Sequence, residues 1–117
     1  IYIDDLLDAW ETIINNPEKC SGEIFCLGPD NAIKIKDYVT LIAKKLNWTG
    51  HVNWNTKPSR PGEIYLLNST NHKITSRLGW VPKVELNDGL DKTIANWKNI
   101  LENNLPYNID RKFSRGK

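Results

Sequence analysis

The stretch EIFCLGPDNAIKIKDYVTLIAKKL, residues 23–46, joins two apolar patterns and sets the expected fold class. Residues 23–27 are short, apolar and followed by Gly28-Pro29, which is typical of a buried β-strand. From Ile35 to Leu46 the apolar residues instead recur every three or four positions, the spacing of a helix that lies on a sheet. A strand followed by such a helix predicts an α/β fold.

The same alternation is expected on both sides of this stretch. Residues 1–3 read as a strand and residues 6–14 as a helix whose start is capped by Asp4 or Asp5, a structural role that we prefer to a catalytic one. The expected downstream elements are strands at 51–54 and 64–67, a short helix after Ser69 or Thr70 that ends at Gly79, and a last helix after Asn87 or Asp88.

The length of 117 residues, without a repeat or a linker, predicts one domain. We expect this domain to cover residues 1–105 and a basic, mobile tail to cover residues 106–117. The chain contains no methionine and opens inside an apolar, strand-like run, so we expect a piece of a longer protein or a processed form.

Composition argues against several partners. A net charge of +2 is too small for a nucleic-acid-binding protein, which needs a concentrated basic face. A leader and a run of about 18 apolar residues are both lacking, so no membrane partner is expected. Cys20 and Cys26 match neither a redox pair nor a zinc site, which favours reduced thiols and a cytoplasmic protein.

Common catalytic and metal-binding patterns are missing from the sequence. There is no glycine-rich phosphate loop and no nucleophile elbow. His51 and His72 are isolated, so each is interpreted as a surface histidine and no metal site is expected. Trp10 and Trp97 fall on apolar helix faces, which favours core packing over stacking on nucleic acid.

The segment KPSRPGEIYLL, residues 57–67, holds the candidate binding residues. Its Pro-Gly pair predicts a turn that brings Arg60 and Glu63 close together. A guanidinium offers a planar fork of donors for phosphate, and a carboxylate accepts hydrogen bonds from sugar hydroxyls. The alternative from the residues alone is a surface turn with an Arg60–Glu63 salt bridge.

The order of three stretches resembles a known family. IYIDDLLDA, then residues 23–46, then SRPGEIYLLNSTNHKITSRLGWVPKVELNDGLDKTIANW is similar to the C-terminal part of the NAD-dependent nucleotide-sugar epimerase and dehydratase family, the extended short-chain dehydrogenases. The resemblance runs from Ile1 to about Asn103. It implies a small mixed α/β lobe of an extended Rossmann-type enzyme that lacks the nucleotide-binding sheet.

The resemblance also implies what lies elsewhere in such an enzyme. NAD(P) and a Tyr-x-x-x-Lys catalytic pair belong to an N-terminal part upstream of Ile1, so neither catalytic nor cofactor-binding residues are expected on this chain. The full-length parent is expected to be a homodimer.

Four residues receive substrate-binding roles from the resemblance. Arg60 matches an arginine that contacts the diphosphate, and Glu63 stands where relatives more often carry aspartate to hold a ribose hydroxyl. Ile35 matches an apolar residue that packs on the base, although it also belongs to the apolar face of its own helix. Leu67 falls, by spacing alone, at a position that borders the sugar in the 4-epimerases.

We therefore predict the substrate-binding lobe of an NAD-dependent enzyme that acts on a nucleoside-diphosphate sugar, as an epimerase or a 4,6-dehydratase. The lobe by itself is expected to be inactive. The alternative is a non-catalytic nucleotide-binding or protein-interaction module, which an upstream gene region without a glycine-rich turn and Tyr-x-x-x-Lys would favour.

Overall fold

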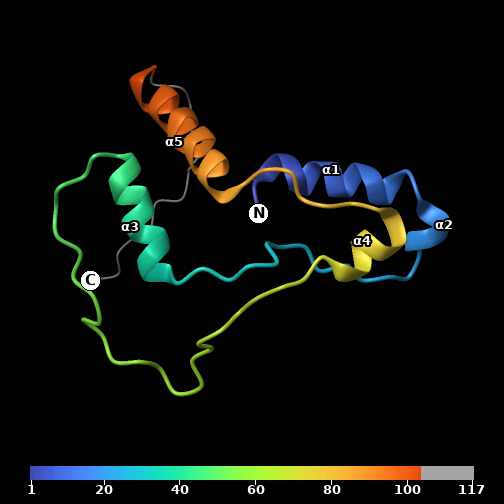
Figure 1. The fold of residues 1–117 in the computed structure, drawn as a ribbon, viewed down its shortest axis with the longest axis horizontal. Helices are drawn as coiled ribbons and strands as arrows, with labels where there is room; N and C mark the ends of the chain where they lie inside the picture. Colours follow the sequence, from blue (N-terminus) through green and yellow to red (C-terminus); the bar gives the residue numbers. More distant parts are fainter. Residues whose placement is uncertain (104–117) are drawn as a thin grey trace, which may run out of the picture.

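Helices joined by long irregular segments make up the computed structural model, which describes residues 1–103 (Figure 1). Within this range the helices are α1 (Ile3–Ile14), α2 (Pro17–Cys20), α3 (Ile35–Lys45), α4 (His72–Leu78) and α5 (Leu86–Glu102). The predicted tail, residues 106–117, lies outside the described residues.

The long helices match the periodicity of the sequence, but several of the expected caps are wrong. Asp4 and Asp5 lie inside the first turn of α1, whose N-cap is Tyr2, and their charge faces the positive end of the helix dipole. The N-cap of α5 is Glu85, ahead of the expected Asn87 or Asp88. The end of α4 is as predicted, since Gly79 adopts a left-handed conformation with φ of 71°.

None of the expected strands forms in the part of the chain that the structure describes. Ile3 is taken into α1, and the segments 23–27, 51–54 and 64–67 are irregular. A strand needs a partner for its backbone N–H and C=O groups, and no backbone hydrogen bond between described residues joins two of these segments. The structure is therefore helical, and the expected mixed α/β lobe is not confirmed.

The core is small and lies between α1 and α4. Ala9, Ile74 and Trp80 are buried together, and Figure 1 shows α1, α2 and α4 at the same end of the molecule. The predicted inward residues of α4, Ile74 and Leu78, are confirmed. The prediction that Trp10 packs in the core is wrong, because this residue is 59% exposed.

Side chains take the place of a strand partner for residues 24–28. The amide of Asn71, which is 1% exposed, accepts a hydrogen bond from Gly28 N at 3.0 Å and donates one to Gly28 O at 2.6 Å. The Ser69 hydroxyl donates to Leu27 O at 3.2 Å, and the Lys73 ammonium donates to Ile24 O at 2.9 Å. Backbone groups that a ladder would have paired are thus satisfied by side chains at the start of α4.

Ion pairs add to this connection. The Glu23 carboxylate contacts Lys73 Nζ at 2.7 Å and Arg77 Nη1 at 2.6 Å, one helical turn apart on α4. Hydrogen bonds from these two cations hold the pKa of Glu23 below its ordinary value. The irregular segment that begins at Glu23 is consequently tied to α4 at several points.

Helix α3 lies apart from this core. Figure 1 shows α3 separated from α1, α2 and α4, and none of its residues is buried. The Cα radius of gyration is 18.3 Å, against about 13 Å for a compact domain of this size. None of the helices in residues 1–103 has the length and hydropathy needed to cross a bilayer.

Candidate functional site

The Pro-Gly turn forms as the sequence predicts. Glu63 N donates to Arg60 O at 3.1 Å, which closes a four-residue turn. Proline in the second position and Gly62 in the third, with φ of +74°, fit a type II turn, where the third residue needs a positive φ. The turn therefore brings Arg60 and Glu63 together.

The carboxylate of Glu63 binds the backbone of its own turn. Arg60 N donates to Glu63 Oε2 at 3.2 Å, and no ion pair between described residues includes the Arg60 guanidinium. The alternative of a salt bridge between the two side chains is thus wrong for this structure. The five donors of the guanidinium are left for a ligand.

An open cavity of about 550 Å³ lies at this turn. Its lining consists of Asn55, Lys57, Pro58, Ser59, Arg60 and Glu63. Two cations against one carboxylate give the cavity a positive balance, and an arginine fork is suited to the paired oxygens of a phosphate. The charges of the lining favour an anion over a cation.

A second and larger cavity, of about 880 Å³, contains Ile35. The start of α3 supplies Ile35 and Tyr38, and the first turns of α5 supply Leu86 and Leu90. Ile35 is 78% exposed, so it belongs to the wall of this cavity and not to a core stripe.

The structure thus groups the four candidate residues unequally. Arg60 and Glu63 share one cavity, and Ile35 lines the other. Leu67 is 85% exposed and lines neither of them.

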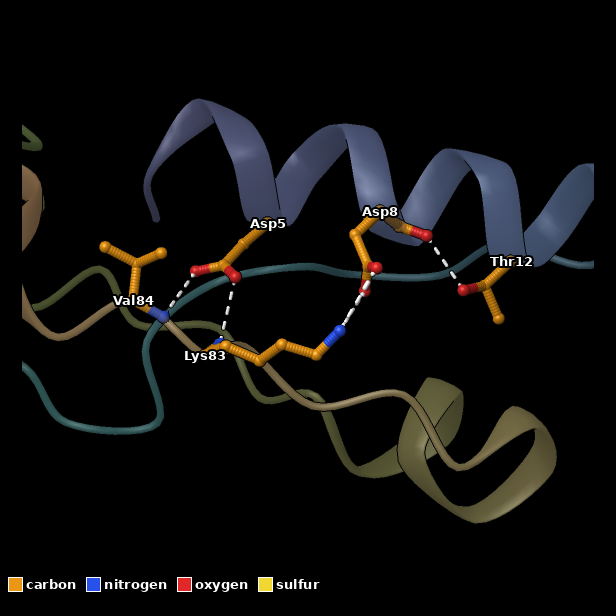
Figure 2. Close-up of polar contacts among 5 residues, drawn as sticks. All are labelled: Asp5, Asp8, Thr12, Lys83 and Val84. Atoms are coloured by element: carbon orange, nitrogen blue, oxygen red, sulfur yellow. Dashed lines mark hydrogen bonds and ion pairs between the residues drawn. The ribbon is translucent and has the colours of Figure 1, made fainter.

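Asp5 is a buried polar residue whose partners the sequence did not reveal. Its side chain is 3% exposed and accepts hydrogen bonds from Lys83 N at 2.9 Å and Val84 N at 3.1 Å (Figure 2). The adjacent Asp8 contacts Lys83 Nζ at 3.2 Å. In the sequence, an Asp-Asp pair at a helix start indicates a cap. The tertiary role of Asp5 could not be read there, because its partners Lys83 and Val84 are far away in the chain.

The chain offers no fitting cradle for a dinucleotide. Its seven glycines are scattered, and none stands two residues from another, whereas a dinucleotide fingerprint needs Gly-x-Gly at the start of a helix. In residues 1–103 there is likewise no group of three His, Cys, Asp or Glu side chains that could hold a metal ion.

Curated relatives share most of this chain. It is 33% identical over 95 residues to GDP-L-fucose synthase 1 of Arabidopsis thaliana, covering 80% of this chain and 27% of that protein. It is 28% identical over 107 residues to UDP-D-apiose/UDP-D-xylose synthase 1 of the same plant, and the match covers 81% of this chain and 28% of that protein. With human dTDP-D-glucose 4,6-dehydratase the identity is 27% over 126 residues, and the match covers 93% of this chain and 34% of that protein.

The chain spans about a third or less of the length of these relatives, and no family model and no solved structure matches it. The resemblance inferred from the sequence is nevertheless confirmed by several such proteins: the chain is related to the nucleotide-sugar epimerase and dehydratase enzymes and corresponds to part of their length.

Proposed function

We propose that this chain is the substrate-binding lobe of a cytoplasmic, NAD-dependent enzyme that acts on a nucleoside-diphosphate sugar, as an epimerase or a 4,6-dehydratase. The names of the relatives support the substrate class, because each contains a nucleoside diphosphate: GDP, UDP or dTDP. The cofactor would be held by another part of the enzyme, since the residues of this chain do not fit it.

The observation that carries the proposal is the Arg60 cavity. Glu63 binds its own backbone, which leaves the guanidinium of Arg60 beside the ammonium of Lys57 in a cavity that is open to solvent. A diphosphate placed there would receive charge-assisted hydrogen bonds, and the second oxygen of Glu63 would remain for a ribose hydroxyl. Ile35 would contact the base and Leu67 the sugar, assignments that rest on the family resemblance.

The role of the lobe would be positioning. Holding the nucleotide end uses binding energy far from the reacting carbon, so that the sugar is presented to the catalytic part in a productive orientation. Residues of this chain would bind and orient the substrate without exchanging protons or hydride with it.

Calorimetric titration of the complete protein with UDP, GDP, CDP and dTDP tests this role. Arg60→Ala should weaken binding of the preferred nucleotide about 10- to 100-fold, because a hydrogen bond to a charged group contributes about 1.5–3 kcal/mol. Arg60→Lys keeps the positive charge but loses the planar fork of donors. Its nucleotide affinity should lie between those of the wild type and Arg60→Ala. NAD binding should change little.

Lys98→Ala is the matched control, since it removes one positive charge from an exposed position of α5. It should leave nucleotide binding unchanged. Equal loss of nucleotide and NAD binding in Arg60→Ala, or loss of neither, would contradict the proposed site.

A second candidate is a protein-interaction module without catalytic activity. The run of exposed apolar residues Ile64, Tyr65, Leu66 and Leu67 favours it. A wild-type protein that binds none of the four nucleotides, encoded by a gene without a glycine-rich turn and Tyr-x-x-x-Lys upstream, would support this candidate.

A further inference from the structure

The carboxylate of Asp5 joins two parts of the chain that are far apart in sequence. It projects from the first turn of α1 and accepts hydrogen bonds from the backbone N–H groups of Lys83 and Val84, in the connection between α4 and α5 (Figure 2). Each carboxylate oxygen binds one N–H, so both oxygens are used by the same short segment.

This contact is chemically different from the ion pair beside it. A buried carboxylate carries a large desolvation cost unless hydrogen bonds compensate for it, and the two N–H donors provide that compensation. The contact between Asp8 and Lys83 Nζ is solvent-exposed, and such pairs contribute little. The fixed point between α1 and the connection is therefore Asp5.

The segment held by Asp5 forms one side of the 880 Å³ cavity. Asp5, Pro82 and Val84 line it together, and Ile35 and Tyr38 of α3 line it as well. The connection continues directly into Leu86 and Leu90 of α5, which also line the cavity. Releasing residues 83 and 84 would loosen this side of the cavity, because Val84 is part of its lining.

We propose that Asp5 is a positioning residue: it fixes the connection 82–85 and thereby shapes the cavity for an uncharged ring of the ligand. This inference rests on the proposed function, in which Ile35 contacts the base of a nucleotide. Tyr2, Ile35 and Tyr38 offer apolar and aromatic surface to a ring, whereas Asp30 and Glu85 disfavour a phosphate there. In the proposed function the phosphates would bind Arg60, which lines the other cavity.

Hydrogen exchange in the complete protein, measured by mass spectrometry, tests without a ligand whether Asp5 fixes the connection 82–85. Peptides that contain residues 83 and 84 should be protected in the wild type, although these residues lie outside the helices. Asp5→Asn keeps the shape but presents an amide donor to one of the two N–H groups, and should speed exchange there at least tenfold. Asp4→Asn, an exposed change in the same turn, and Asp8→Asn should not.

Ligand binding tests the consequence for the cavity. Asp5→Asn should weaken binding of the preferred nucleoside diphosphate about tenfold and leave binding of pyrophosphate, which has no ring, unchanged. The inference would be overturned by free exchange at residues 83 and 84 in the wild type, by unchanged exchange at these residues in Asp5→Asn, or by equal loss of both ligands.

A second pair of variants keeps the test valid if Asp5→Asn does not fold. Lys83→Pro removes the N–H that binds Oδ1, while Lys83→Ala keeps it, and both lose the contact with Asp8. Only Lys83→Pro should speed exchange at Val84; the same effect in both variants would overturn the role of the backbone bond. A wild type that binds no nucleotide would refute the proposed function, while the exchange data would still decide whether Asp5 holds the connection.

Discussion

The side-chain amide of Asn71 satisfies both backbone groups of Gly28. A Cβ at this position would collide with the side chain of Ser69, which donates to Leu27 O. Asn71 therefore holds the segment 24–28 in the way that a neighbouring strand would, through one acceptor and one donor. Because both groups of Gly28 are buried, their pairing is important for stability.

Asn71→Ala should lower the free energy of unfolding by about 2–6 kcal/mol, because it leaves a buried N–H and a buried C=O unpaired at about 1–3 kcal/mol each. Urea denaturation followed by circular dichroism measures the change. Asn68→Ala, which removes one exposed hydrogen bond of 3.3 Å to Asp30 O, should cost no more than about 0.5 kcal/mol. Equal costs for the two variants would show that the Gly28 contact is not important.

Between elements, α4 is connected to the segment 23–28 by charge as well as by hydrogen bonds. Glu23 faces Lys73 and Arg77, whose side chains lie four positions apart on one face of α4. The Arg77 guanidinium also donates to Lys19 O in α2, so α2, the segment and α4 meet at this point. The lowered pKa of Glu23 makes this connection dependent on pH.

The pH dependence has a definite sign. Since the folded-state pKa of Glu23 lies below its ordinary value of 4.5, the ionised carboxylate stabilises the fold at pH values above 4.5. This contribution should disappear as the pH falls from about 4.5 through the lowered folded-state pKa. The difference in unfolding free energy between wild type and Glu23→Gln should therefore be constant near neutral pH and shrink on acidification.

Urea titrations at several pH values between 7 and 3 measure that difference. Glu18→Gln is the control, because Glu18 is exposed and takes part in no ion pair among the described residues. A wild-type advantage over Glu23→Gln that persists unchanged at pH 3 would contradict the assigned role of the ion pairs.

At the scale of the whole molecule, many large apolar side chains of the described residues are exposed, and two groups of them lie close together in the chain. One is the outer face of α1, which carries Ile3, Leu7, Trp10 and Ile14, and the other is the run 64–67. Exposed apolar surface of this extent favours association. The exposure of these side chains agrees with the open shape of the molecule, whose Cα radius of gyration is 18.3 Å.

The 117-residue chain should therefore self-associate reversibly, with a sedimentation coefficient that rises with concentration. Ile64→Lys combined with Leu66→Lys should reduce association without loss of stability, because both side chains are already exposed. The control, Thr49→Lys combined with Asn53→Lys, adds the same charge at exposed polar positions and should reduce association less. A wild-type chain that stays monomeric at every concentration would contradict this prediction.

The candidate site was predictable in part. The turn at residues 60–63 follows from Pro61 and Gly62, whose backbone preferences are local, and the structure shows it. The partner of Glu63 was not predictable, because a carboxylate beside an arginine can equally bind the guanidinium or a backbone N–H. The short helix α2 was also missed, since Asn16-Pro17 reads as the end of a helix although proline is equally suited to the first turn of the next.

The sequence by itself determined the helices α1, α3, α4 and α5, the glycine end of α4, and the family resemblance that several relatives confirm. Helix periodicity and turn chemistry act over a few neighbouring residues, so they can be read directly. Only the tertiary structure decided that residues 23–27 are held by Asn71 and α4, and that Asp5 binds residues 83 and 84. Those outcomes depend on partners more than 40 positions away in the chain, and apolar spacing contains no information about which distant group satisfies a given backbone or carboxylate.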